Sequence, residues 1–145
     1  MRKILIATHG HLASGFASAI SILAGDAHHV EFIDAYTEDE PGDFSPKIVS
    51  FVQAVAPEDE AVVFTDLMVG SVNQKVCQVL ASCETKPNLF VVTGSNLAML
   101  LAVVLEFRSI SREVLDELAG QAMVEVVEFP TEVDGGVCDD VAFLE

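Results

Sequence analysis

Polar side chains able to carry chemistry follow short apolar runs of the sequence. His9 comes soon after the first run, Asp66 ends a later one, and Ser71 lies a few residues beyond it. A carboxylate that accepts a hydrogen bond from the imidazole Nδ1–H would fix the tautomer and leave Nε2 as a neutral nucleophile. A helix beginning at Ser71 would offer backbone N–H groups and a hydroxyl to an anion. These residue types predict nucleophilic chemistry at a histidine beside an anion site.

The segments that must position these residues read as strands of a parallel sheet. Three apolar runs show no alternation, which is typical of strands covered on both faces, and a fourth alternates like a half-exposed edge strand. The continuous runs are residues 4–7, 60–66 and 88–94, and the alternating run is residues 30–36. If the first and third strands are neighbours, His9 and Asp66 face each other across one crevice at the carboxyl ends of the strands.

Segments with the periodicity of a helix lie between the predicted strands and after the last of them. Ser45 reads as the N-cap before Pro46, Ser71 with Gln74 reads as a capping box, and Gly120 reads as a helix stop. The predicted helices cover about residues 13–24, 45–56, 71–83, 97–107 and 111–118. This order predicts the α/β class, with a three-layer, open, doubly wound and mainly parallel sheet of strand order 2-1-3-4.

The C-terminal region divides into a last strand and a tail. Met123 to Phe129 alternates and is expected to pair antiparallel with the edge strand at residues 88–94, either in its own chain or in a neighbouring one. Residues 131–145 are expected to form an acidic tail. The sequence therefore predicts one domain over residues 1–130, followed by this tail.

Composition excludes several classes of function. The formal net charge of −16 disfavours nucleic-acid binding. The apolar stretch after Met1 is too short for a signal peptide, and no apolar run approaches the roughly 20 residues that cross a bilayer. Three cysteines without C-x-x-C spacing indicate neither disulfides nor zinc. A cytoplasmic location is expected.

Each candidate residue also has a simpler interpretation. Ser71 is explained by helix capping alone, and Asp66 by capping a turn. His11 could pair as a metal ligand with His9 or with His28-His29, but no recognised ligand spacing is present, so no metal is expected. Gly10 to Gly15 has phosphate-loop spacing but lacks the lysine that would contact phosphates, so it is at most an anion nest.

Three stretches together resemble the mannose/fructose/sorbose-type enzyme IIA of the bacterial phosphoenolpyruvate-dependent sugar phosphotransferase system (PTS). The resemblance covers about residues 1–130. The stretches are Thr8-His9-Gly10, Asp66-Leu67-Met68-Val69-Gly70-Ser71-Val72-Asn73-Gln74 and Gly94-Ser95-Asn96-Leu97-Ala98-Met99-Leu100. Two positions depart from the family pattern, since the family usually has glycine where Val69 stands and often proline where Ala98 stands. Valine tolerates positive φ poorly, which bears on the conformation of the loop.

The resemblance implies a phosphohistidine carrier that needs no cofactor. It implies that His9 accepts a phosphoryl group from phospho-HPr and passes it to a IIB component, which links the chain to the membrane components IIC and IID. Asp66 would support His9, while Ser71, Gly70 and Gly10 would bind the phosphoryl group. The resemblance also implies a homodimer that exchanges the C-terminal strand.

Two other functions compete with this interpretation. One is the phosphoryl-donating subunit of a dihydroxyacetone kinase, which shares the fold and the histidine. The other is a regulatory or ligand-binding domain that has lost turnover, and the departure at Val69 is its main support. The Thr-His-Gly and Gly-Ser-Val-Asn-Gln stretches favour the transport component.

Overall fold

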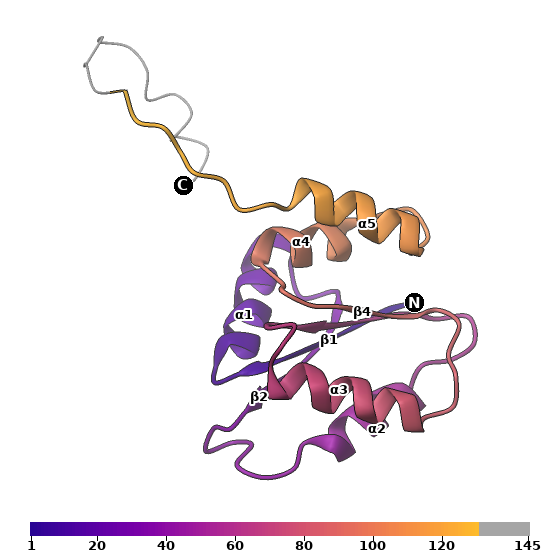
Figure 1. Ribbon diagram of the computed structural model, residues 1–145. Coiled ribbons are helices and arrows are strands. Elements are labelled where there is room, and N and C mark those ends of the chain that lie inside the picture. Colours follow the sequence, from indigo (N-terminus) through magenta and orange to yellow (C-terminus); the bar gives the residue numbers. More distant parts are fainter. Residues whose placement is uncertain (131–145) are drawn as a thin grey trace.

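A four-stranded parallel sheet forms the centre of the protein, in a computed structural model that describes residues 1–130 (Figure 1). The strands are β1 (Arg2–His9), β2 (His29–Ala35), β3 (Glu60–Thr65) and β4 (Leu89–Val92). Their order is β2-β1-β3-β4 and every pairing is parallel, so the predicted strand order is confirmed. The alternating run forms the edge strand β2, as its pattern indicated.

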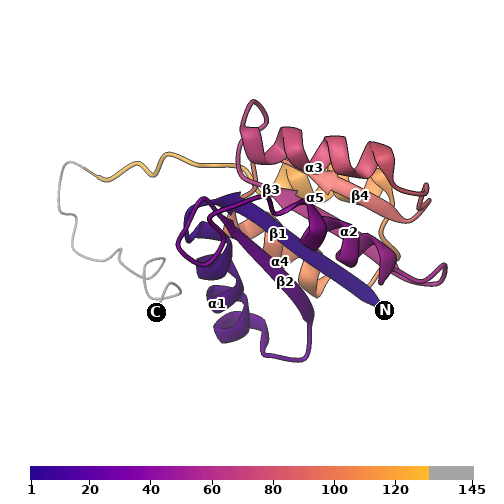
Figure 2. The ribbon, with the colours of Figure 1, turned by 90° about the horizontal axis from the view of Figure 1, so that it is seen from below.

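Helices cover both faces of the sheet, which makes three layers, seen from the side in Figure 1. On one face lie α1 (Leu12–Ala24), α4 (Leu97–Leu105) and α5 (Arg112–Gln121), and on the other, from which Figure 2 is seen, lie α2 (Ser45–Gln53) and α3 (Ser71–Ser82). Successive residues of β1 alternate between the two cores: Ile4 and Ile6 face the first group, and Leu5 faces the second. Both cores need apolar side chains, which is why the β1 sequence shows no alternation.

Two helix starts differ from the prediction. Ser45 is the first residue of α2 rather than its N-cap, which is Phe44. Gly70 is the N-cap of α3, and Ser71 makes no capping bond, so the capping box of Ser71 and Gln74 is wrong. The predicted cap at Ser111 is confirmed, because its hydroxyl accepts a hydrogen bond from Val114 N–H at 3.2 Å. The hydroxyl of Ser71 is therefore available for other contacts.

The end of the fold also differs from the prediction. Helix α5 continues through Gly120, which does not stop it. Residues 122–130 form no strand, and after Ala122, whose carbonyl accepts from Asn96 Nδ2 at 2.7 Å, the chain leaves the body of the molecule (Figure 1). Pairing of Met123 to Phe129 with β4 of the same chain is therefore wrong, and pairing with a neighbouring chain stays a prediction. The predicted tail, residues 131–145, lies outside the described residues.

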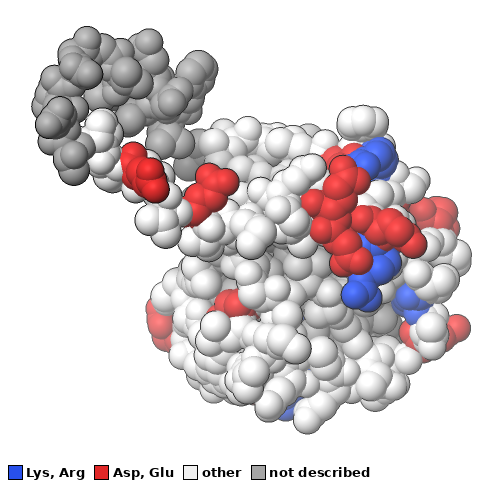
Figure 3. All heavy atoms as spheres, turned by 45° about the horizontal axis from the view of Figure 1, so that its top comes forward, with Lys and Arg blue, Asp and Glu red and all other residues white. Residues whose placement is uncertain are grey.

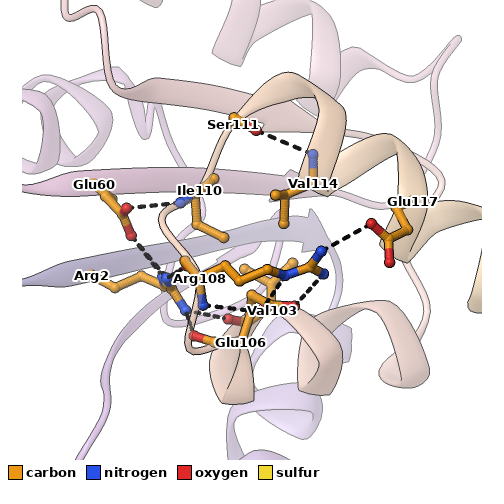
Figure 4. Close-up of polar contacts among 9 residues, drawn as sticks. All are labelled: Arg2, Glu60, Val103, Glu106, Arg108, Ile110, Ser111, Val114 and Glu117. Carbon is orange, nitrogen blue, oxygen red and sulfur yellow. Dashed lines mark hydrogen bonds and ion pairs between the residues drawn. The ribbon is translucent and has the colours of Figure 1, made fainter.

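The amino end of the sheet is fastened to the connection between α4 and α5 (Figure 4). The Arg2 guanidinium donates to Glu60 Oε2 at 2.9 and 3.0 Å and to the carbonyls of Val103, Glu106 and Arg108. Glu60 Oε1 accepts the N–H of Ile110 at 2.8 Å. Hydrogen bonds from Arg108 lower the pKa of Glu106 to about 2. This network lies at the end of β1 opposite His9, so it supports the fold and leaves the carboxyl end of the sheet open.

No helix within residues 1–130 combines the length and the apolar character that a membrane crossing requires.

Candidate functional site

His9 and Asp66 meet at the carboxyl ends of the two central strands. His9 is the last residue of β1, and Asp66 directly follows the neighbouring strand β3. The imidazole Nδ1 and the backbone N–H of His9 both lie 2.9 Å from Asp66 Oδ2. Asp66 Oδ1 accepts the N–H of Leu67 at 3.0 Å. The structure thus brings together the two residues that strand order placed across one crevice.

The ionised carboxylate of Asp66 determines that Nδ1 of His9 carries a proton. Burial alone would raise the pKa of the Asp66 carboxyl, but hydrogen bonds from the backbone and ring of His9 outweigh it and lower the pKa. The carboxylate accepts only, so Nδ1 must carry the proton. In the neutral imidazole Nε2 then holds a free lone pair and, because the His9 side chain is 38% exposed, a partner can reach it.

The N-terminus of α3 lies beside this lone pair. Ser71 Oγ is 3.4 Å from His9 Nε2, and no side chain caps the first turn of α3. The first turn of α1 is different, because Thr8 Oγ1 accepts from Ala13 N–H at 2.7 Å and Asp34 Oδ1 accepts from Ser14 N–H at 2.9 Å. The anion nest considered for Gly10 to Gly15 thus has its N–H groups partly occupied. Of the two helices, α3 offers the free N–H groups.

Two glycines flank His9 for different reasons. A Cβ on Gly70 would lie 3.2 Å from His9 Cε1 and equally close to Leu67, so a side chain there would press on the imidazole. Gly10 has a φ of +59° and its N–H donates to the carbonyl of Ala35 at 2.9 Å. Gly70 thus permits close approach of α3 to the ring, and Gly10 makes the turn after β1.

Val69 fits its loop without strain. Within the described residues, Tyr36 alone among non-glycine residues has a positive φ, so the backbone of Val69 is not left-handed. Its side chain is 90% exposed and obstructs nothing at His9. The departure from the expected glycine therefore leaves the site geometry intact, and it gives no support to a domain that has lost turnover.

Three residues at the site were missed by sequence reasoning. Tyr36 OH lies 2.7 Å from Ser71 Oγ, yet the residue follows an edge strand and carries no motif. Thr65 Oγ1 lies 2.8 Å from Asn73 Oδ1, and Asn73 Nδ2 donates to the carbonyl of Met68 at 3.0 Å. Asn73 thereby ties the loop after β3 to α3. For Asn73, the only signal in the sequence was its place in the stretch from Asp66 to Gln74.

His11 belongs to a separate pair on the β2 side. Its Nδ1 lies 3.1 Å from Asp34 Oδ2, and its Nε2 lies 3.3 Å from Glu38 Oε1. The hydrogen bond to Asp34, helped by the charge of Glu38, outweighs burial and raises the pKa of His11. His28 bonds to the carbonyl of Ala24 at the other end of β2. Neither histidine joins His9, and within residues 1–130 no three His, Cys, Asp or Glu side chains are grouped to hold a metal.

Comparison with known proteins relates this arrangement to one family. Residues 3–129 match the family described as "PTS system fructose IIA component". Among solved structures, the PTS component EIIA from Streptococcus agalactiae superposes with a TM-score of 0.66 at 24% identity, covering 86% of this chain and 97% of that one. The mannose/sorbose-specific IIA subunit from Enterococcus faecalis gives 0.66 at 22% identity, covering 90% and 98%. At these identities the structures establish a shared fold.

Proposed function

Because the chain belongs to the family of PTS fructose IIA components, we propose that it carries phosphoryl groups on Nε2 of His9. The donor is phospho-HPr and the acceptor is a IIB component, through which the chain associates with membrane components IIC and IID. The exchange takes place in the cytoplasm. One observation carries the proposal: His9 Nδ1 is bonded to Asp66, and Nε2 faces the uncapped N-terminus of α3.

The geometry suits transfer between two imidazoles. The Nε2 lone pair of His9 forms the new N–P bond while the N–P bond of the donor phosphohistidine breaks, and that electron pair stays on the donor nitrogen. No proton has to move, because Nδ1–H of His9 remains bonded to Asp66. The ring gains positive charge on phosphorylation, and the ionised Asp66 balances it. Catalysis then reduces to positioning and to stabilising the phosphoryl oxygens.

The N-terminus of α3 would hold the phosphoryl oxygens. Ser71 supplies a hydroxyl, and the first-turn N–H groups supply donors and the positive end of the helix dipole. The net charge of −16 does not oppose this, since exposed charges are screened beyond about 8 Å at physiological salt. Exposed Leu67, Met68 and Val69 lie in the loop before α3 and offer apolar contact to an approaching partner.

The proposal is tested by reconstituting the phosphorylation chain. The protein is incubated with phosphoenolpyruvate, enzyme I and HPr, and its intact mass is measured. We expect the mass of one phosphoryl group to be gained, to be lost in acid and to persist in base, and to disappear when a cognate IIB is added. A mass unchanged with active HPr present would refute the carrier function.

Gly70→Ala is expected to slow phosphorylation by about tenfold, since small displacements of reacting groups cost large factors in rate. The new Cβ would lie 3.2 Å from His9 Cε1, so the imidazole or α3 must shift. Gly42→Ala is the matched control, because a Cβ there meets nothing within 4 Å. The initial rate of mass gain measures both variants. Equal rates for Gly70→Ala and the wild type would show that close approach of α3 is not needed.

We propose further that two chains associate through residues 122–130. This segment exposes Val124, Val126 and Phe129, each more than 80% accessible, and Phe107, just after α4, is 94% accessible. Strand β4 is an edge of the sheet, with a free row of backbone groups. Figure 3, with α4 and α5 turned forward, shows that most charged side chains gather on the right, that a broad area in the middle carries few, and that acidic side chains also lie on the segment that leaves the body. A strand exchanged between two chains would cover both the apolar side chains and the edge.

Val126→Pro is expected to convert the dimer to monomers, because proline removes a backbone donor from the exchanged strand. Val126 is 93% exposed in the single chain, so the change leaves that chain's own packing untouched. Val126→Thr keeps strand propensity and is expected to remain dimeric. Light scattering at micromolar concentration distinguishes the two states. A folded wild-type monomer under these conditions would refute the dimer.

A further inference from the structure

Tyr36 has an unusual backbone for its residue type. Its φ is +66°, and no other non-glycine residue within residues 1–130 has a positive φ. The left-handed region is unfavourable for a bulky aromatic residue and persists only where surrounding contacts impose it. Such strain is a reason to ask what the side chain gains from its position.

The turn after β2 holds Tyr36 in this conformation. The N–H of Tyr36 donates to the carbonyl of Glu40 at 3.1 Å, and the N–H of Glu40 donates to the carbonyl of Thr37 at 3.1 Å. The hydroxyl of Thr37, a buried residue, donates to the carbonyl of Asp34 at 2.7 Å. Backbone and side-chain bonds together fix the turn, so the direction of the Tyr36 side chain is set by the fold.

That direction carries the ring across to the histidine. The Tyr36 ring centroid lies 5.6 Å from that of His9, and the ring also forms a T-shaped pair with Phe44, with centroids 6.2 Å apart. The phenol oxygen lies 2.7 Å from Ser71 Oγ. Tyr36 therefore connects the β2 side of the site with the N-terminus of α3 on the opposite side of His9.

Counting donors fixes the direction of these hydrogen bonds. In the neutral imidazole that the carrier function requires, Nδ1 of His9 donates to Asp66, so Nε2 is an acceptor and the Ser71 hydroxyl must donate to it. A hydroxyl has one proton, so Ser71 can only accept from Tyr36, whose O–H then donates. The result is a chain of donors that runs from Tyr36 through Ser71 to Nε2.

We propose that Tyr36 is a positioning residue for phosphoryl transfer, acting through Ser71. Its O–H occupies an acceptor position on Ser71 Oγ and keeps the Ser71 proton directed at the place where the N–P bond forms. When Nε2 takes the phosphoryl group, the Ser71 proton is released from the lone pair and donates to a phosphoryl oxygen, while Tyr36 retains its bond to Ser71. This inference rests on the proposed carrier function of His9.

Tyr36→Phe tests the proposal because it removes only the hydroxyl and keeps the ring against His9 and Phe44. We expect the rate of His9 phosphorylation at saturating phospho-HPr to fall about fivefold, the worth of one hydrogen bond. The KM for phospho-HPr should stay within about twofold, because Tyr36 acts on positioning rather than on docking. Ser45→Ala is the control, since its hydroxyl bonds only to nearby Asp43.

The same change in a Ser71→Ala background shows whether Ser71 mediates the effect. There, Tyr36→Phe should cost nothing further, since the residue through which it acts is absent. A further fivefold loss of rate in the double variant would overturn the proposal. So would a single Tyr36→Phe variant that is as fast as the wild type, or one in which only the KM changes.

A measurement without any phosphoryl donor separates this inference from the carrier function. The ¹⁵N chemical shift of His9 Nε2 should move in the same direction in Tyr36→Phe as in Ser71→Ala, because both lose the ordered donor to the lone pair. An unchanged shift in Tyr36→Phe would overturn the inference. If the wild type gains no phosphoryl mass while these shifts behave as expected, the carrier function fails and the hydrogen-bond chain stands.

Discussion

Replacement of His9 by glutamine is expected to abolish phosphoryl transfer from HPr entirely. The amide side chain offers no imidazole nitrogen with a free lone pair, so no N–P bond can form. His11→Ala is expected to retain full labelling, because Nε2 of His11 faces the carboxylate of Glu38 at 3.3 Å, which repels a phosphoryl group. Intact mass after incubation with the reconstituted donor chain measures both variants.

This pair of variants discriminates between the two neighbouring histidines. Both have an Asp partner on Nδ1, since His9 bonds to Asp66 and His11 to Asp34. They differ at Nε2, where His9 faces a hydroxyl and His11 faces an acid. Labelling retained in His9→Gln would contradict the assignment of the acceptor.

Asp66→Asn is expected to slow transfer by about a hundredfold, within the range for loss of a group that controls protonation. Asp66 accepts from two N–H groups of His9 and from the N–H of Leu67. An asparagine must turn its NH₂ toward one of these donors, so it weakens the loop or permits the wrong imidazole tautomer. It also removes the charge that balances the phosphorylated ring.

The pH profile checks this explanation. The pKa of the Asp66 carboxyl lies below its ordinary value of 3.8, so the wild type keeps this charge throughout the neutral range and loses it only in strong acid. Titration of Asp66 itself should therefore add no pH dependence to the wild-type rate between pH 6 and pH 8. Asp26→Asn is the matched control, because it also removes one carboxylate charge but lies beside Ser21 at the other end of the sheet. This variant should accept the phosphoryl group at the wild-type rate. Unchanged rates in Asp66→Asn would make Asp66 a bystander.

The sequence alone determined the sheet and the meeting of His9 with Asp66. Strand type follows from local patterns, because a strand covered on both faces is apolar throughout and a strand with one exposed face alternates. Once β1 and β3 are neighbours, their carboxyl ends coincide, and polar residues at those ends are brought together. Ser71 was identified as a site residue because it lies in a stretch that resembles the enzyme IIA family.

Only the tertiary structure decided what the side chains around His9 contact. Ser71 looked like a cap, yet the extended backbone of Gly70 makes that glycine the cap and leaves the serine hydroxyl to Tyr36 and His9. Tyr36 reaches the site through its left-handed backbone, in a turn where its N–H donates to the carbonyl of Glu40 and the N–H of Glu40 donates to that of Thr37. A propensity describes what one residue prefers, whereas these conformations are imposed by several contacts acting together.

Residues 122–130, which follow α5, are a second case in which a local sequence pattern does not determine the structure. Its alternation indicated a strand, but a strand exists only when a partner supplies hydrogen bonds to its backbone. Within one chain, α5 directs residues 122–130 away from β4, so Val124 and Val126 remain exposed. The sequence specifies a segment suited to pairing, and the path of the chain decides that its own sheet does not provide the partner.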